Sequence, residues 1–399
     1  MNRKKALEVI ILFGLVSLFG DIAYEAARSI NGPYLRLLAA DAAVVGLIAG
    51  AGEFLGYALR LASGYFSDKS RAYWFFVFLG YGLIICVPLL SLTGAWQAAA
   101  IFIILERVGK AIRSPARDTI LCSASKHVGT GFGFGLHEAM DQIGAIAGPL
   151  ILAAFFMLGP LQKQVVHYQR GYQILWIPYL ALLCCLILAY LRLPHPEKLE
   201  GCEDSTEAPE KFSGLFRLYA VFTFITTLGF ANFILLGYHF KTTGILSDAQ
   251  IPLFYALAMG VDAAAALGIG KIYDIFKVRK RDERAGLNTL VIVPILSLVI
   301  PVTAFSGIFS LSLIGVLIWG VVMGSHETVM RSAIADIVHS KRRGMGYGIF
   351  NTTYGAGFFL GSALLGFLYS ISINLLIIAT ALLQIAALVV FIKLRGCKS

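Results

Sequence analysis

Charged side chains occur inside stretches of this sequence that are otherwise apolar. Asp21, Glu25 and Arg28 are spaced at i, i+4 and i+7, which places them on one face of a helix predicted over residues 9–30. Glu53 and Arg60, seven residues apart, share a helix face in the same way. Ionisable groups at membrane depth are costly and usually serve a solute or ion pathway. We therefore predict that these side chains contact a solute or couple its movement to an ion.

A second group of charges lies in the apolar segments 97–114 and 131–157. Its members are Glu106, Arg107, Lys110, His137, Glu138 and Asp141. Some of them also have a structural explanation, because Glu106 and Lys110 are four residues apart and can neutralise each other. His137 can be a packing residue, and Lys110 and Arg113 can extend toward lipid headgroups. The predicted solute and coupling set is Asp21, Glu25, Arg28, Glu53, Arg60, Arg107, Glu138 and Asp141.

The deeper charges include more acids than bases. The acids are Asp21, Glu25, Glu53, Glu106, Glu138, Asp141 and Asp262, and the bases are Arg28, Arg60 and Arg107. A carboxylate that lacks a cation in a medium of low dielectric takes up a proton. Arg28 is within reach of Glu25 but two turns from Asp21, so Asp21 is the predicted proton carrier and Asp141 the second candidate. The same surplus of acids would also suit a cationic solute.

Composition indicates the elements that position these charges. Of 399 residues, 58% are hydrophobic and 14% are charged, and the mean hydropathy is +0.78, whereas soluble domains are about 25% charged. Runs of about 20 apolar residues span a bilayer as helices, and period-two alternation typical of a barrel is missing from them. The predicted spans are 9–30, 43–65, 73–93, 97–114, 131–157, 172–193, 214–239, 249–269, 287–305, 308–329, 346–369 and 373–393. We predict an all-α integral membrane protein with twelve transmembrane helices.

The formal net charge of +10 has a distribution that sets orientation. If both termini are cytoplasmic, the outer loops hold only Arg36, Lys163, Arg170 and Lys241 among the 33 Lys and Arg residues. Basic residues gather on the cytoplasmic side of membrane proteins. The charge therefore predicts cytoplasmic termini in a cell (inner) membrane, and it does not imply a nucleic-acid partner.

The chain also has a repeated organisation. The polar, acidic stretch 194–212 separates a six-helix bundle over 1–193 from a second over 213–399. Gly131-Phe-Gly-Phe-Gly135 returns 213 residues later as Gly344-Met-Gly-Tyr-Gly348, and the same offset carries Gly144 to Gly357 and Gly148 to Gly361. Small residues four apart let membrane helices approach closely. The two bundles are thus predicted to be pseudo-symmetric, with 194–212 as a cytoplasmic linker.

Short motifs carry a family resemblance. Gly64-Tyr-Phe-Ser-Asp68-Lys-Ser-Arg71 resembles the G-x-x-x-D-R-x-x-R loop of the major facilitator superfamily, with Lys69 in place of the usual Arg. A degenerate second copy runs from Gly270 to Lys277. Arg107-Val-Gly109 resembles the arginine motif of the family's fourth helix, without its Gln. Gly144-Ala-Ile-Ala-Gly148-Pro149 resembles the antiporter signature G-x-x-x-G-P, without its trailing glycine pair.

The resemblance implies two bundles of six helices with a solute site between them that opens to each side in turn. It also implies a cytoplasmic latch, in which Asp68 lies near helix ends and pairs with nearby arginines. The predicted latch residues are Gly64, Asp68, Arg71, Arg113, Arg117 and Asp118, with Asp274, Arg331 and Asp336 in the second half. The alternative is a solvated surface without a latch. The segment 64–71 is expected to form a short loop, and Gly144, Gly148 and Pro149 to pack helices.

These features predict a proton-coupled secondary transporter of a small polar or charged solute, and the antiporter-like motif favours antiport or efflux. An uncoupled facilitator and a proton symporter for uptake remain alternatives, with an integral-membrane enzyme more distant. Metal-ligand clusters and phosphate-binding loops are missing from the sequence, and the histidines are scattered. We therefore predict no cofactor and no metal. The expected partners are the solute, protons and lipid, with the chain working as a monomer.

Overall fold

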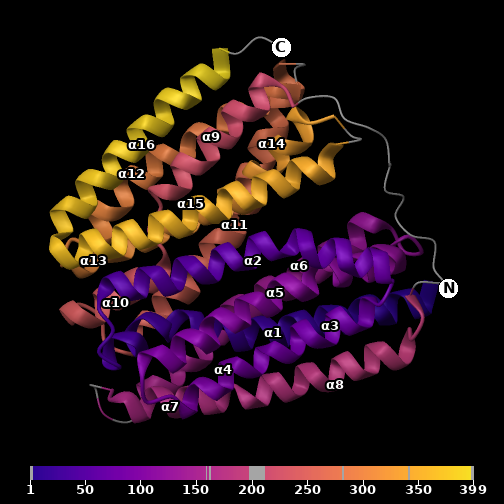
Figure 1. Cartoon of the computed structure of the whole chain (residues 1–399), viewed down its shortest axis with the longest axis horizontal. Coiled ribbons are helices and arrows are strands. Elements are labelled where there is room, and N and C mark those ends of the chain that lie inside the picture. The colour runs from indigo at the N-terminus through magenta and orange to yellow at the C-terminus, as the bar shows by residue number, and fades with distance from the viewer. Residues whose placement is uncertain are drawn as a thin grey trace. The chain divides into compact units, whose positions relative to one another are not determined.

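A computed structural model describes residues 3–158, 160, 163–196, 212–280, 283–339 and 342–396, and these residues contain helices but no strands (Figure 1). Most of the predicted linker, residues 197–211, lies outside the described residues. The helices of the first half are α1 Arg3–Leu37, α2 Ala42–Ser70, α3 Tyr73–Gly82, α4 Cys86–Leu89, α5 Trp96–Ser125, α6 Thr130–Met157, α7 Val165–Ile174 and α8 Trp176–Arg192. Those of the second half are α9 Gly214–Leu228, α10 Phe233–Thr243, α11 Gln250–Lys280, α12 Ile292–Ala304, α13 Phe309–Glu327, α14 Val329–Ile337, α15 Arg343–Ile371 and α16 Ile373–Gly396.

The apolar segments form membrane-spanning helices. Within the described part of the chain, 11 helical segments are long and apolar enough to cross a bilayer, and α5 is the remaining predicted span. Some spans consist of two consecutive helices, such as α9 and α10, which are separated near Asn232. The Asn232 side chain accepts a hydrogen bond of 2.8 Å from the Ile234 amide and so begins α10. The predicted all-α multi-pass fold is confirmed.

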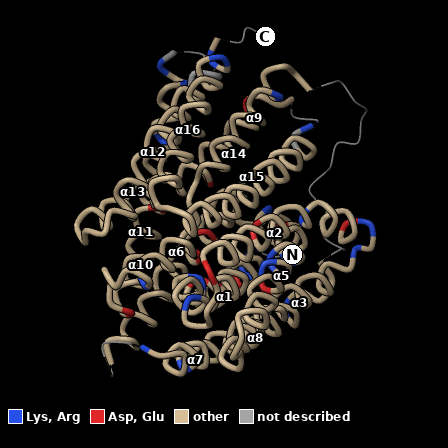
Figure 2. The backbone as a smooth tube through the Cα atoms, turned by 60° about the vertical axis from the view of Figure 1, so that its left-hand side comes forward, with Lys and Arg blue, Asp and Glu red and all other residues tan. Residues whose placement is uncertain are grey.

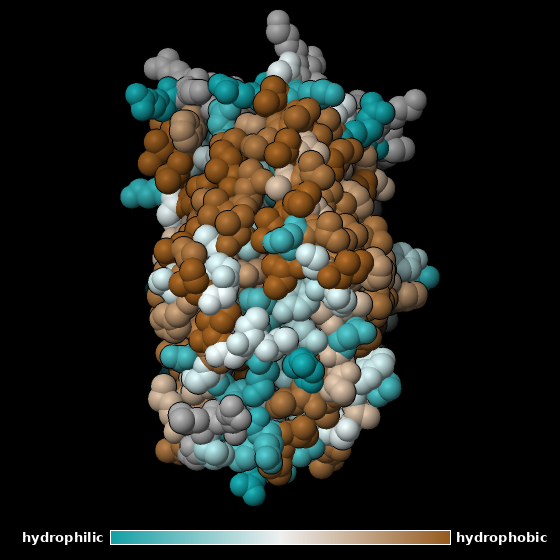
Figure 3. Space-filling view, turned by 90° about the vertical axis from the view of Figure 1, so that its left-hand side faces the viewer, coloured by the Kyte–Doolittle hydropathy of each residue, from teal (hydrophilic) through white to brown (hydrophobic). Residues whose placement is uncertain are grey.

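Exposed apolar side chains mark the lipid-facing surface of these helices. Leu382 and Ile392 of α16 are 63% and 68% exposed, and Ile177 of α8 is 72% exposed. Figure 3 shows brown, apolar side chains over much of the upper part of one face, below a teal rim, while teal and white side chains run through its lower part. Such exposure suits contact with lipid rather than water. In Figure 2 the charged residues lie mainly near helix ends, but red and blue segments also occur along α1 and α5.

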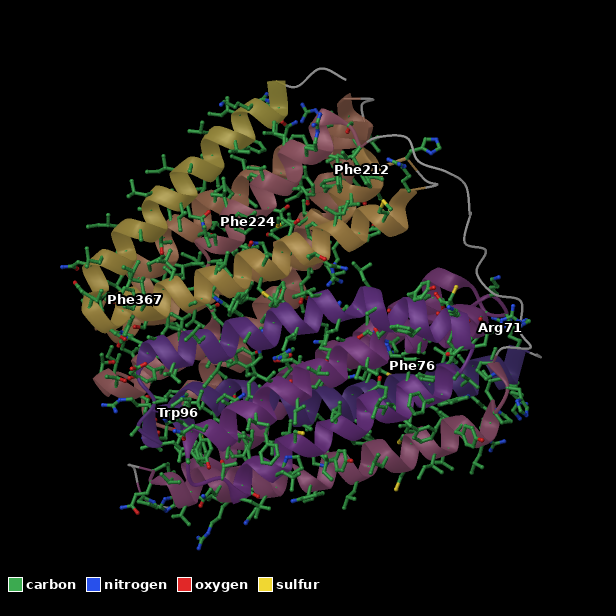
Figure 4. The ribbon with its side chains drawn as sticks, viewed as in Figure 1. Arg71, Phe76, Trp96, Phe212, Phe224 and Phe367 are labelled. Atoms are coloured by element: carbon green, nitrogen blue, oxygen red, sulfur yellow. The ribbon has the colours of Figure 1, made fainter. Side chains whose placement is uncertain are left out.

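The helices form two compact units. The first contains Met1–Ala40, Leu55–Asp204 and the short segment Ser247–Ala256; the second contains Asp41–Phe54, Ser205–Leu246 and Leu257–Ser399. In the first unit, Arg71 and Phe76 lie toward one end of the helices and Trp96 toward the other (Figure 4).

The same contact between a helix glycine and the backbone of a neighbouring helix occurs in both units. In the first, α1 packs along α6, and Gly148 of α6 lies against the backbone of Ile22. In the second, α9 packs along α15, and Gly361 of α15 lies against the backbone of Leu228. The offset of 213 residues between Gly148 and Gly361 therefore joins two positions that serve the same contact. Glycine is used at both because a Cβ atom would collide with backbone.

The predicted loop at 64–71 is wrong. α2 continues through Gly64 to Ser70, and the chain turns only at Arg71, whose φ of 53° is positive. The serines that suggested a loop bond to their own helix instead, since Ser67 Oγ donates to the Gly64 carbonyl at 2.9 Å. The second copy behaves alike, because α11 continues through Gly270 to Lys280. One glycine disfavours a helix by only about 1 kcal/mol, which a long span tolerates.

Candidate functional site

The site begins with the charged stripe on α1. Asp21, Tyr24, Glu25 and Arg28 are all buried, and α1 packs against α5, α6 and α8. Arg28 Nη1 lies 3.5 Å from Glu25 Oε1. The other oxygen of Glu25 accepts a hydrogen bond from the Tyr255 hydroxyl, which belongs to the segment Ser247–Ala256 of the same unit. Glu25 is thus held from two sides, by a cation and by a phenol.

Three cations of α5 converge on the ring of Tyr24. Lys110 Nζ lies 4.7 Å from the ring centroid, the Arg113 guanidinium 5.6 Å and the Arg107 guanidinium 5.9 Å. Lys110 also donates a hydrogen bond of 3.3 Å to the Tyr24 hydroxyl. Cations over an aromatic face gain electrostatic stabilisation that increases away from water. Tyr24 therefore organises these charges at the centre of the unit.

Arg113 has a deeper position than the predicted latch would give it. Its guanidinium lies between the rings of Tyr24 and Tyr81, 4.9 Å from the latter, and the residue is only 3% exposed. α5 extends to Ser125, so Arg113 lies well inside the helix instead of at its end. The structure therefore places Arg113 beside the α1 stripe.

The second acid of the site comes from α6. The charges that act on Asp21 include those of Asp141, Lys110 and Glu25, and the Tyr24 hydroxyl is a hydrogen-bond partner. Close contact between the helices makes this possible, because a Cβ atom on Gly144 would lie 2.8 Å from Asp21 Cβ. Asp141 also has the imidazole of His137 at 3.9 Å from one of its oxygens. The structure thus brings together Asp21 and Asp141, the two predicted proton carriers.

The charged side chains of this unit divide into ion pairs and a group of two acids and two cations outside those pairs. Its ion pairs include Arg28 with Glu25, Arg107 with Glu106 at 3.3 Å, Arg117 with Asp118 at 2.8 Å and, at the surface, Arg192 with Glu8 at 3.7 Å. Lys110, Arg113 and Asp21 make no ion pair within 4.0 Å among the described residues, and Asp141 has the imidazole of His137 at 3.9 Å. Asp21 has Asp141 and Lys110 as electrostatic neighbours, and Asp141 has Lys110 and Arg113. We refer to Asp21, Asp141, Lys110 and Arg113 as the central quartet.

Among the other predicted solute residues, Arg60 is an electrostatic neighbour of Lys110. Glu53 is buried in the portion of α2 that belongs to the second unit. The Arg60 guanidinium lies 4.8 Å from the Tyr57 ring centroid. Glu138 lies on the exposed face of α6, where Gln142 Nε2 approaches one of its oxygens at 3.4 Å.

The predicted latch residues lie near the far ends of the same helices. Asp68 is exposed in the last turn of α2, and a Cβ atom on Gly64 would lie 3.5 Å from Pro115 of α5. α2 and α5 are also joined by Ser63, whose hydroxyl donates to the Ala111 carbonyl at 2.7 Å. Asp68 thus lies near the end of α2, and its latch role stays a prediction.

In the second unit the corresponding contacts centre on Asp336. This carboxylate accepts hydrogen bonds from the Tyr273 hydroxyl at 2.6 Å and from Lys277 Nζ at 2.7 Å. Asp274 and the side chain of Arg331 are exposed. Asp336, near the end of α14, therefore anchors α11 through Tyr273 and Lys277. Tyr273 directly precedes Asp274, the acid of the motif's second copy.

Sequence reasoning missed two partners of the site, Tyr255 and Tyr81. Tyr255 contacts a residue 230 positions earlier, and periodicity within one helix gives no signal for such a contact. Among the described residues, no group of three or more His, Cys, Asp or Glu is placed to hold a metal ion.

Comparison with known sequences assigns the chain to a family. The Major Facilitator Superfamily matches residues 12–325. The chain belongs to the major facilitator superfamily. A protein of Mycobacterium tuberculosis (strain H37Rv) is 40% identical over 396 residues, which make up 98% of this chain and 93% of that protein. An MFS-type transporter of Methanocaldococcus jannaschii is 34% identical over 157 residues, 39% of each chain.

Solved structures of transporters share the major facilitator fold with this chain. The nucleoside transporter NupG superposes with a TM-score of 0.70 at 13% identity, covering 97% of this chain and 98% of NupG. A bacterial homolog of the human lysosomal transporter Spinster gives a TM-score of 0.69 at 12% identity, covering 98% and 96% of the two chains. At this identity the likeness shows the fold alone and does not specify a solute.

Proposed function

We propose that this major facilitator protein is a proton-coupled secondary transporter of a small charged solute, working by alternating access. The observation that carries the proposal is the approach of two acids, the buried Asp21 of α1 and the partly buried Asp141 of α6, across a close helix contact in which a Cβ atom on Gly144 would lie 2.8 Å from Asp21 Cβ. Two carboxylates that share a poorly solvated site disfavour simultaneous ionisation, so one of them holds a proton readily. The positive charge of Lys110 favours the ionised form of Asp21, so a closer approach of Lys110 to the acids would favour release of that proton.

Asp21 is the better proton carrier of the two. Glu25 is already neutralised by Arg28 and hydrogen-bonded by Tyr255, whereas Asp21 has the Tyr24 hydroxyl as a hydrogen-bond partner but no cation within 4.0 Å among the described residues. Asp141 has His137 and Arg117 near it as additional partners. The latch role proposed for Asp68 follows from its position at the end of α2.

The wider setting belongs to the proposal as well. The Lys and Arg distribution supports cytoplasmic termini in the cell (inner) membrane, and we propose that the monomer is the working unit, with one bundle in 1–193 and one in 213–399. The glycines of the antiporter-like motif serve the α1–α6 contact and recur in the α9–α15 contact. Because they act as packing residues in both units, they do not set the direction of transport.

The test compares Asp21→Asn with wild-type protein in reconstituted vesicles, using a solute first identified by thermal-shift screening. The variant should lose accumulation driven by a pH gradient while retaining counterflow, since exchange of solute requires no net proton movement. Glu8→Gln, which removes a carboxylate at the surface beside Arg192, is the matched control and should behave as wild type. Retained pH-driven accumulation in Asp21→Asn would refute the assignment, and loss of counterflow would place Asp21 in the solute site instead.

A further inference from the structure

The central quartet contains two cations that the ion pairs of the unit do not use. Lys110 is partly accessible and Arg113 is 3% exposed. One terminal nitrogen of Arg113, Nη1, is buried and has no hydrogen-bond partner. A buried guanidinium nitrogen without an acceptor is unfavourable, so this nitrogen is available to a ligand that brings an acceptor oxygen. An oxyanion supplies that group.

Charge balance determines when such a ligand fits. With Asp21 and Asp141 both ionised, the quartet is neutral, because the two acids offset Lys110 and Arg113. Adding an anion to the neutral quartet would leave an uncompensated negative charge at low dielectric. If one acid is protonated, the quartet carries a single positive charge, and an anion with one negative charge restores neutrality. The same groups therefore link the binding of an anion to the uptake of a proton.

We infer that the transported solute is an anion that bears a carboxylate or phosphate group and binds at Lys110 and Arg113. It is carried together with protons held by Asp21 or Asp141, one proton for each negative charge of the solute. This inference rests on the proposed function and deepens it by naming the solute class and the sense of coupling, which is symport. The proton enters from water onto a carboxylate oxygen of Asp21 or Asp141 and leaves with the solute. The planar guanidinium of Arg113 suits two oxygens of one carboxylate or phosphate.

The surroundings of both acids favour this assignment over a cationic solute. Asp21 faces Asp141, Lys110, Tyr24 and Glu25; Asp141 faces Arg117, Ser17, Lys110, Arg113 and His137. A cation entering the quartet would meet Arg107, Lys110 and Arg113, all within 6 Å of the Tyr24 ring centroid. Like charges at that range repel strongly where water is scarce.

The experiment measures ligand-induced thermal stabilisation of the purified full chain in lipid nanodiscs. Acetate, succinate, inorganic phosphate and glycerol 3-phosphate are the anionic probes, and glucose, uridine and choline are the comparators, each at about pH 5.5 and about pH 7.5. At least one anion should raise the melting temperature. Its apparent affinity should fall by up to about tenfold for each unit by which the pH rises, because binding requires a protonated acid. Addition of that anion in weak buffer should also draw about one proton per bound charge from solution, as a pH indicator would report.

Variants connect the signal to the quartet. Lys110→Gln and Arg113→Gln should abolish anion stabilisation, whereas Arg192→Gln, which removes an exposed cation of α8 (side chain 62% exposed), should retain it. Arg113→Lys keeps the buried charge if Arg113→Gln fails to fold, and it should bind about tenfold more weakly because the fork is lost. The inference is overturned if none of the four anions stabilises the protein, if only a comparator does, if both glutamine variants bind normally, or if no proton is taken up. Anion binding that survives while a pH gradient drives no accumulation would count against proton-coupled transport instead.

Discussion

Replacement of Gly148 by alanine gives a quantitative test of how α1 and α6 position the site. A Cβ atom at Gly148 would lie 3.0 Å from both the Cα and the carbonyl carbon of Ile22, and closer still to its carbonyl oxygen. Ordinary carbon contacts are about 3.5–4.0 Å. The obstacle is backbone, which cannot rotate aside, so the two helices must separate by about 0.5–1 Å. We expect this separation to forfeit packing along the whole α1–α6 contact.

The magnitude follows from two opposing terms. Overpacking of this kind destabilises by about 1–3 kcal/mol, and a backbone collision belongs at the upper end of that range. Alanine is favoured over glycine inside a helix by about 1 kcal/mol, which offsets part of the loss. The net expectation is a destabilisation of about 2 kcal/mol, or about 4 °C in melting temperature. Because Gly144 and Asp21 share this contact, pH-driven transport should fall as well.

A matched variant in the same helix separates the two terms. Gly135→Ala in α6 meets no other heavy atom within 4 Å of the new Cβ, so only the propensity gain remains, and its melting temperature should stay level or rise. The assay is thermal unfolding of both variants in the same lipid nanodiscs. Equal melting temperatures for Gly148→Ala and Gly135→Ala would refute the packing argument.

Three further substitutions test other parts of the structure. Glu25→Gln leaves the buried Arg28 without its carboxylate and should lower stability by about 3 kcal/mol; unchanged unfolding would show that Arg28 is neutralised elsewhere. Asp68→Asn should slow transport while leaving ligand-induced stabilisation intact, and equal loss of both would remove it from the latch. Asp336→Asn, which weakens contacts with Tyr273 and Lys277, should cost about 2 kcal/mol in unfolding experiments, whereas Asp274→Asn should cost almost nothing; the reverse order would contradict the assignment.

Much of the fold could be predicted from the sequence, because the length and apolarity of a span are local properties. The division of one span into α9 and α10 was less accessible, since it depends on a cap at Asn232 within an apolar run. The loop predicted at 64–71 failed for a related reason. Glycine and serine favour turns on average, yet Ser67 satisfies its hydroxyl within the helix.

The site was predictable where its residues share one helix. The spacing of Asp21, Glu25 and Arg28 placed them on one face, and the structure adds that Arg28 approaches Glu25. The depth of Arg113 was not accessible, because α5 continues to Ser125, beyond the span expected from hydropathy. Counting Arg113 and Lys110 with the deeper charges reduces the surplus of acids and adds two cations near Asp141.

The most direct test of the central claim counts protons that accompany the solute. Vesicles containing the protein and a pH indicator in the lumen are given an inward gradient of the stabilising anion, without an imposed pH difference. Wild-type protein should acidify the lumen in proportion to solute entry. Asp21→Asn should move solute by exchange without acidification. Solute entry into wild-type vesicles with no change in lumenal pH, or acidification that persists in Asp21→Asn, would contradict that claim.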